Sequence, residues 1–343
     1  MTVFDVAAEA GVSLATVDRV LNGRKGVRPA TIGRVRSAVE RLGFKRDSFA
    51  AGLATRRQER FCFMLPARGP NSFMNALRES VAAAAARMEE NRVIVRILDY
   101  PAFDEQMLCR RLAELDPRDC DGVAAVAIES PPVRQEIDRL VARGIPLVTL
   151  VSDVSPSRRA HFHGIDNKAA GRVAASLIGR MVHVPRGKIA MVVGRMTLHD
   201  HADRRLGFEQ VMRREFPQLA LLPPIEGLDD STVTEKLVGR LLALNEDIVG
   251  LYSIGAGNRG IIAALAHRRP SQAALPPPVT VAHELTPHAR DALLSGLFTA
   301  VLHQDQEQEV ADAIAALRAL NRDEADFPAR TVRLQIFLRD NVP

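Results

Sequence analysis

The sequence lacks an apolar run long enough to cross a membrane, and it lacks the basic start and apolar core of a secretory signal. Its opening stretch, MTVFDVAAEAG, carries an acidic residue instead, and we therefore expect a cytoplasmic protein. Cysteine is scarce: Cys62, Cys109 and Cys120 show no CxxC spacing and no cysteine–histidine cluster. Buried reduced thiols are expected rather than a disulfide or a zinc site.

The chain also lacks low-complexity segments and any period that would indicate a solenoid. Its 343 residues are enough for two or three folding units. A hydrophobic content of 47% and a charged content of 25% are ordinary for a soluble globular protein.

Positive charge is concentrated at the start of the chain. Residues 1–60 hold 12 Lys and Arg against 6 Asp and Glu, a net charge of +6, while the whole chain has a net charge of +5. The rest of the chain is therefore nearly neutral. A compact basic region on a neutral body suggests that this region meets a polyanion, although a merely solubilising surface would have the same charge.

The first 46 residues read as three short helices separated by turns. A capping-box spacing opens a helix over VFDVAAEA, and Gly11 allows a tight turn after it. Ser13 can cap a second helix, whose apolar positions recur at helical spacing until Gly23. Pro29 suits the first turn of a third helix.

This order of helix, glycine turn and helix is typical of a helix-turn-helix, whose second helix enters the major groove of DNA. Its predicted outward positions are Ser13, Leu14, Ala15, Thr16, Asp18, Arg19 and Asn22. Arg19 can bond guanine with two hydrogen bonds, and Asp18 can orient Arg19 or accept from a cytosine amino group. From these residues alone, the alternative is a three-helix bundle that binds protein.

From Phe61 onward, short apolar runs alternate with helical stretches. Nine runs rich in Val, Ile and Leu have the length of strands: FCFMLP, RVIVRILDY, DGVAAVAIE, IPLVTLVSD, GKIAMVVG, DIVGLYSIG, PVTVAHEL, FTAVLHQD and VRLQIFLRD. Such runs between helices indicate parallel sheets covered on both faces. Nine strands suit two α/β lobes better than one sheet, with DVSPSRRAHFH as the crossing.

At this point the sequence resembles the LacI/GalR family of transcription regulators. The resemblance rests on the long segment VFDVAAEAGVSLATVDRVLNG…VRPATIGRVRSAVERLGF, and it continues to the ending LQIFLRDNVP. It implies a hinge helix after the headpiece, whose leucine enters the minor groove of a palindromic operator and kinks it. Leu53 matches that leucine, and Ala50 matches the small residue at which two hinge helices approach.

The same resemblance implies an effector cleft at the carboxyl ends of the strands of a periplasmic-binding-protein-like domain. It assigns ligand contacts to Asn71, Phe73 and Met74 in PNSFMNAL, to Arg204 in DHADRRLGF, to Asn258 in GAGNRG and to Gln304 in LHQD. Two segments depart from the family, so that Glu284 in AHELTPH and Ser152 and Asp153 in VSD replace its aspartates. Sugar, sugar acid, polyol and sugar phosphate all stay open as ligands.

Two other motifs are weaker. Gly255, Gly257 and Gly260 satisfy GxGxxG between a strand and a helix, and Glu284 lies where a ribose-binding acid would be expected, so an NAD-dependent oxidoreductase or redox sensor is the alternative. A lone GxGxxG is a weak signal, and tight turns also require glycine. The trio His199, His201 and Asp203 has the spacing of a strand face but begins a helix, so no metal is expected.

The resemblance thus predicts a small all-α helix-turn-helix headpiece (1–46), a hinge (47–59) and a two-lobed α/β periplasmic-binding-protein-like domain (60–343). Lobe 1 is expected at about 60–162 and 287–325, and lobe 2 at about 163–286 and 326–343. The function expected is a homodimeric, cytoplasmic repressor that binds operator DNA and a sugar-like effector, with no catalysis and no cofactor. A solute-binding transport protein is disfavoured by the basic headpiece. Whether the effector acts as inducer or corepressor stays open.

Overall fold

A computed structural model describes residues 3–21, 26–42, 58–89, 92–255, 257–267, 276–322, 324 and 331–343. The chain divides into two compact units, Met1–Arg57 and Gln58–Pro343. Each unit has its own buried apolar core.

The first unit contains the three predicted helices, α1 (Val3–Ala10), α2 (Leu14–Leu21) and α3 (Pro29–Arg41). Ser13 starts α2, because its Oγ accepts a hydrogen bond from the backbone N–H of Thr16 over 3.3 Å. Val6, Val17 and Val35, one from each helix, are fully buried together. The helical spacing of apolar residues in the sequence therefore produces the core of this unit.

The first sheet of the second unit has the strand order β2-β1-β3-β4-β5, and all its pairs are parallel. Its strands are β1 (Glu59–Pro66), β2 (Val93–Tyr100), β3 (Gly122–Ala125), β4 (Leu147–Leu150) and β5 (His161–His163). Successive side chains of β1 point to opposite faces, so that Phe61 and Phe63 pack on one side and Cys62 and Met64 on the other. This sheet and its helices are called lobe 1.

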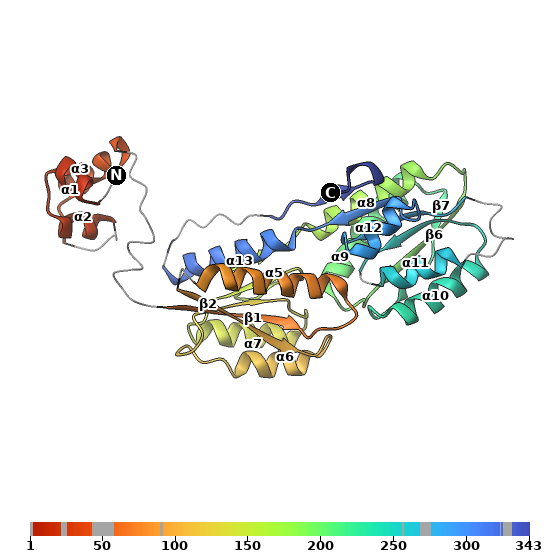
Figure 1. Ribbon diagram of the computed structural model, residues 1–343, viewed down its shortest axis with the longest axis horizontal. Helices are drawn as coiled ribbons and strands as arrows, with labels where there is room; N and C mark the ends of the chain where they lie inside the picture. Colours follow the sequence, from red (N-terminus) through yellow and green to blue (C-terminus); the bar gives the residue numbers. More distant parts are fainter. Residues whose placement is uncertain are drawn as a thin grey trace. The chain divides into compact units, whose positions relative to one another are not determined.

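Four helices cover the two faces of the lobe 1 sheet. Helices α5 (Ser72–Met88) and α13 (Gln306–Asn321) lie on one face, and α6 (Glu105–Ala113) and α7 (Pro131–Ala142) on the other (Figure 1). The sheet is buried on both faces, which explains why its strands read as nearly continuous apolar runs.

The second sheet has the order β12-β11-β10-β9-β6-β7, with β8 also paired to β6, and with its helices it forms lobe 2. Its strands are β6 (Gly187–Val193), β7 (Leu219–Leu221), β8 (Ile225–Glu226), β9 (Ile248–Ser253), β10 (Val279–His283), β11 (Ala300–His303) and β12 (Gln335–Phe337). One face packs on α8 (Asn167–Met181) and α9 (His199–Glu215). The other packs on α10 (Ser231–Leu244), α11 (Asn258–Ala266) and α12 (Pro287–Leu294), and the 3-10 turn Arg339–Asn341 follows β12.

Three expectations from the sequence need correction. Strand β12 is antiparallel to β11, because the chain reaches it from lobe 1 and not from a helix on the same sheet. The return to lobe 1 comes later than residue 287, because α12 and β11 still belong to lobe 2 and α13 is the first element to pack on lobe 1 again. The short strands β5, β7 and β8 were not predicted, since two or three residues carry no clear alternation.

Helices α8 and α9 cross at two glycines. A Cβ at Gly171 would lie 1.9 Å from the backbone oxygen of Arg204, and one at Gly207 would lie 2.0 Å from that of Lys168. Any larger residue would push the helices apart. The close contact between the two helices fixes the position of Arg204 relative to the lobe 2 sheet.

The cysteines and the helices bear on two further expectations from the sequence. The three cysteines are free; Cys62 and Cys120 are buried and Cys109 is half-buried. Among the described residues, no helix is both long enough and apolar enough to cross a bilayer.

Candidate functional site

Helix α2 presents its predicted DNA-reading residues on the surface of the first unit. Ser13, Leu14, Ala15, Asp18 and Arg19 are exposed. Leu14 is 40% exposed, so its side chain is accessible at the start of α2.

Two further features of the predicted DNA interface can be placed. Thr16 is half-buried, and its hydroxyl lies 2.9 Å from that of Ser13. Asn22, Ala50 and Leu53 lie outside the described residues.

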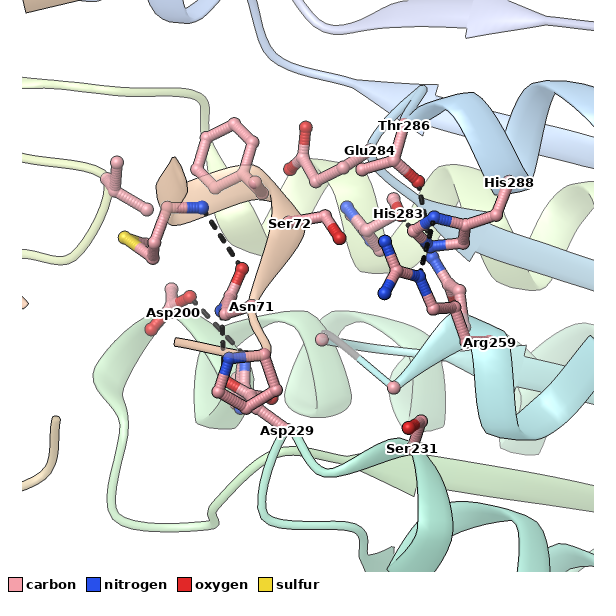
Figure 2. Close-up of a pocket in the computed structure, with 18 of the residues that line it drawn as sticks. Asn71, Ser72, Asp200, Asp229, Ser231, Arg259, His283, Glu284, Thr286 and His288 are labelled. Atoms are coloured by element: carbon pink, nitrogen blue, oxygen red, sulfur yellow. Dashed lines mark hydrogen bonds and ion pairs between the residues drawn. The ribbon is translucent and has the colours of Figure 1, made fainter. Parts of the chain in front are cut away.

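A cavity lies at the carboxyl ends of strands from both sheets of the second unit, where α/β folds bind ligands (Figure 2). Lobe 1 contributes Pro70, Asn71, Ser72, Phe73, Met74 and Val151. Lobe 2 contributes Asp200, His201, Arg204, Asp229, Ser231, Gly255, Gly257, Asn258, Arg259, His283, Glu284, Thr286, His288 and Gln304. This set is called the effector cavity. It includes seven of the nine residues predicted to contact an effector.

Arg204 is the most deeply buried charge of the cavity, with 2% of its surface exposed. Its Nε donates to Asn167 Oδ1 over 2.8 Å, and its Nη1 donates to the backbone oxygen of Ile254 over 2.9 Å. Its Nη2 lies 4.0 Å from Glu284 Oε1 and has no hydrogen-bond partner. Two bonds therefore hold the guanidinium in place and leave one nitrogen for a ligand.

Glu284 and Gln304 form the next part of the cavity wall. Glu284 has a positive φ of 69°, which turns its side chain away from the direction of β10. Its Oε1 accepts from Gln304 Nε2 over 2.8 Å, and its Oε2 accepts from His303 Nδ1 over 3.2 Å. The Oε1 of Gln304 is buried and has no partner, so it can accept a hydrogen bond from a ligand.

Asn258 and His283 both line the cavity and are joined by a hydrogen bond. Asn258 accepts from Ser253 Oγ over 2.7 Å and donates to the backbone oxygen of His283 over 2.9 Å. The His283 Nε2 bonds the Tyr252 hydroxyl over 2.8 Å, and its Nδ1 has no partner. Burial, together with the Arg204 charge, holds the pKa of His283 well below its ordinary value, so the ring is neutral.

The lobe 1 wall is built by the start of α5. Asn71 caps this helix by accepting from the backbone N–H of Met74 over 3.1 Å. Its Nδ2 donates across the cavity to Asp229 Oδ2 over 2.9 Å, a bond between the lobes that Figure 2 shows. Phe73 belongs to the core of lobe 1 and also lines the cavity.

Ser152 and Asp153 do not line the cavity, contrary to expectation. Asp153 forms an ion pair with Arg159 and accepts a hydrogen bond from Thr149 over 2.8 Å. The strand end is turned by Val151, whose φ is +62°, and Val151 lines the cavity in their place. A shift of one residue at a strand end exchanges the side that faces the ligand.

Several lining residues were missed, among them Asp200, Asp229, Arg259, Thr286 and His288. Most lie in the loop before a helix or in its first turn, directly after a strand of lobe 2. That position was a usable signal, because it is where α/β folds place ligand contacts. The Oδ1 of Asp200 is buried without a hydrogen-bond partner.

The histidines whose spacing resembles a metal site form other contacts. His199 donates through Nδ1 to Glu129 of lobe 1, and its Nε2 lies 3.4 Å from Asp203 Oδ2. Nearby, the Arg195 guanidinium lies 4.9 Å from the centre of the Phe103 ring, also across the lobes. Among the described residues no group of three potential ligands could hold a metal ion.

The glycines of the GxGxxG segment each have a packing reason. A Cβ at Gly255 would lie 2.5 Å from His201 Nε2, and one at Gly260 would lie 2.2 Å from the backbone oxygen of Ser231. Gly257 caps α11 with a φ of +113°. The motif therefore needs no dinucleotide to explain it.

Two family models match the chain. Residues 61–325 match the periplasmic binding protein domain, and residues 2–47 match the bacterial regulatory proteins of the lacI family. The first covers more than half of the chain.

Curated relatives agree with these matches. Catabolite control protein A of Priestia megaterium is 26% identical over 62% of this chain and 61% of its own length. The HTH-type transcriptional regulator pepR1 of Lactobacillus delbrueckii subsp. lactis is 28% identical over 57% of this chain and 55% of its own length. The matched region thus spans about three fifths of these relatives or less.

Among solved structures, GanP, a glucose-galactose binding protein from Geobacillus stearothermophilus, superposes with a TM-score of 0.73 at 17% identity. The match covers 84% of this chain and 99% of that protein. At this identity the likeness shows the fold alone.

Proposed function

This chain belongs to the periplasmic binding protein domain family and carries a lacI-family DNA-binding region, and on that premise we propose that it is a DNA-binding transcriptional regulator, a repressor, controlled by a small effector. The effector is polyhydroxylated and binds in the effector cavity. The protein acts as a homodimer on a palindromic operator and catalyses no reaction.

The observation that carries the effector proposal is a set of buried polar atoms without partners. Arg204 Nη2 needs an acceptor, whereas Asp200 Oδ1 and Gln304 Oε1 need donors. Leaving a buried polar group unpaired costs about 1–3 kcal/mol. A hydroxyl group both donates and accepts, so a polyol can satisfy donors and acceptors in the same cavity.

The DNA proposal is supported by the basic start of the chain and by the exposed face of α2. Arg19 is the main base reader, and Asp18 adjusts its preference. Leu53 is the wedge of the hinge and Ala50 the close contact between two hinges.

The coupling proceeds through closure of the two lobes. Asn71 and Asp229, and Glu129 and His199, already bond across the lobes. An effector that bonds both walls favours the closed arrangement, and the change in lobe position alters the spacing of two hinges in the dimer.

A fluorescence titration on a palindromic operator from the protein's own promoter tests the DNA function. Affinity should fall at least about 100-fold between 50 and 200 mM salt, because phosphate contacts release counterions. Arg19→Gln should weaken specific binding about 10- to 100-fold. Arg41→Gln, which removes an exposed partner of Glu9 in the same unit, is the control. Salt-independent binding would contradict the proposal.

A thermal-shift screen of sugars, sugar acids, polyols and sugar phosphates tests the effector side. A bound effector should raise the Tm, and above its Kd the stabilisation should grow with the logarithm of its concentration. The same compound should change operator affinity. A compound that stabilises the protein but leaves operator affinity unchanged would exclude it as the effector.

A further inference from the structure

Arg259 differs from Arg204, the other arginine in the described lining of the effector cavity, in having no acidic partner among the described residues. It lines the cavity from the first turn of α11, and its side chain is exposed. The Nη2 of Arg204 lies 4.0 Å from Glu284 Oε1. Within the part of the chain that the structure describes, no ion pair includes Arg259, so its charge is available to a ligand.

Arg259 begins a chain of hydrogen bonds whose donors point in one direction. Its Nε donates to His288 Nδ1 over 3.4 Å, and His288 Nε2 lies 2.9 Å from Thr286 Oγ1. Burial and the Arg259 charge lower the pKa of His288 to about 4, so the ring carries a single proton at neutral pH. Since Nδ1 accepts, that proton lies on Nε2 and is donated to Thr286. The Thr286 hydroxyl is then left as a donor.

Two helices also begin at this wall without a side-chain cap. Helices α11 and α12 have no side-chain hydrogen bond at their N-caps, Gly257 and Thr286. By contrast, α5 and α10 are capped by Asn71 and Asp230. Uncapped N-termini favour an anion, because their free N–H groups and helix dipoles point to it.

The opposite wall differs in its side chains, which are acidic, although α9 also begins there without a side-chain cap. Figure 2 shows Asp200 and Asp229 on one side of the cavity and Arg259 and His288 on the other. The buried Nη2 of Arg204 and Oδ1 of Asp200 have no hydrogen-bond partners, so a ligand can bond to both. The two sides of the cavity therefore present different chemical groups to a ligand.

We propose that the effector is a polyol that carries an acid group, either a sugar acid or a sugar phosphate. Arg259, the Thr286 hydroxyl and the starts of α11 and α12 bind the acid group, while Asp200 and Gln304 accept hydrogen bonds from the hydroxyls. This inference rests on the proposed function, namely that the cavity binds a polyhydroxylated effector.

Inorganic phosphate probes the acid end without knowledge of the effector. Melting of the full chain is compared in phosphate and in sodium chloride of equal ionic strength. Phosphate should raise the Tm of the wild type by about 2 °C. Arg259→Gln should abolish this rise, while Arg240→Gln, an exposed arginine on α10 outside the cavity, should keep it. Equal rises in all three proteins, or none in the wild type, overturn the proposal.

Calorimetry with matched ligands then separates the two acid groups. The sets are D-glucose, D-gluconate and D-glucose 6-phosphate, and the corresponding ribose compounds. In the set that binds, the acid member should bind about 10- to 100-fold more tightly than the neutral one, and Arg259→Gln should remove that preference. A neutral member that binds as tightly as its acids overturns the inference and leaves the proposed function intact. Loss of the salt-dependent operator binding overturns the proposed function instead.

Discussion

Lobe 1 lines the effector cavity with Asn71, Phe73, Met74 and other uncharged residues, whereas all the charged side chains found in the described lining belong to lobe 2. Arg204, the most deeply buried of these charges, is held by a bond inside lobe 2, to Asn167, whereas Asp229 is also bonded by Asn71 of lobe 1. The apolar groups of lobe 1 exclude water on closure, which strengthens the electrostatic contacts. We infer that lobe 2 recognises the effector and lobe 1 covers it.

The largest expected effect is on the free energy of unfolding, and it comes from the crossing of α8 and α9 that positions Arg204 of lobe 2. Gly171→Ala should lower the free energy of unfolding by about 3 kcal/mol, because the new Cβ meets the backbone of Arg204. Gly239→Ala in α10, where a Cβ meets nothing within 4 Å, should instead stabilise the protein slightly. Denaturant unfolding measures both. Similar values for the two variants would contradict the tight crossing.

Arg204→Met tests recognition by lobe 2 directly. Effector affinity should fall about 100-fold, because a buried guanidinium and its free nitrogen are lost. Arg205→Met, on the same helix but paired with Glu209, should bind normally. Calorimetry with the effector from the screen decides the matter. An unchanged affinity in Arg204→Met would place recognition elsewhere.

Glu309 shows how lobe 1 avoids adding charge. This residue of α13 is fully buried, and neither carboxyl oxygen has a hydrogen-bond partner. Burial and the nearby Glu284 raise its pKa well above its ordinary value. The folded state therefore keeps a proton that the unfolded chain releases above about pH 4.5, and stability falls as pH rises through that range.

Glu309→Gln should remove this loss of stability at higher pH. The variant should be about 1–2 kcal/mol more stable than the wild type at pH 8, and the gain should vanish near pH 4. Chemical unfolding at a series of pH values measures it. A gain that does not depend on pH would mean that packing, not protonation, is responsible.

The smallest effect on effector binding is expected in lobe 1, which covers the effector. Phe73→Leu keeps an apolar side chain in the core of lobe 1 and should weaken effector binding only about 5-fold. The same calorimetric titration that is used for Arg204→Met measures it. A loss as large as that of Arg204→Met would end the division between a recognising and a covering lobe.

Much of this arrangement could be predicted from the sequence. All nine apolar runs became strands, and the helical spacing in the first 46 residues gave α1, α2 and α3. These features are local, because each depends on periodicity within one segment. Arg204 and Gln304 were found through the resemblance to a family, since their segments keep its motifs.

The remainder depends on contacts that no single segment contains. Asp229 lies at the cavity because the two lobes approach each other and Asn71 bonds it. Asp200 lies there because the close crossing of α8 and α9 fixes the position of α9. Asp153 failed as a candidate because of one left-handed residue, Val151, at the end of β4. A positive φ in a β-branched residue has no signature in sequence.

The glycine crossing of α8 and α9 has a consequence for altering this protein as a biosensor. Gly171 and Gly207 hold the cavity's deepest arginine in place without lining the cavity themselves. Libraries aimed at new analytes can therefore vary the cavity wall, above all Arg259 and His288, while this crossing stays constant. Because the two glycines keep this crossing fixed, new specificities can be engineered in the cavity wall without moving Arg204.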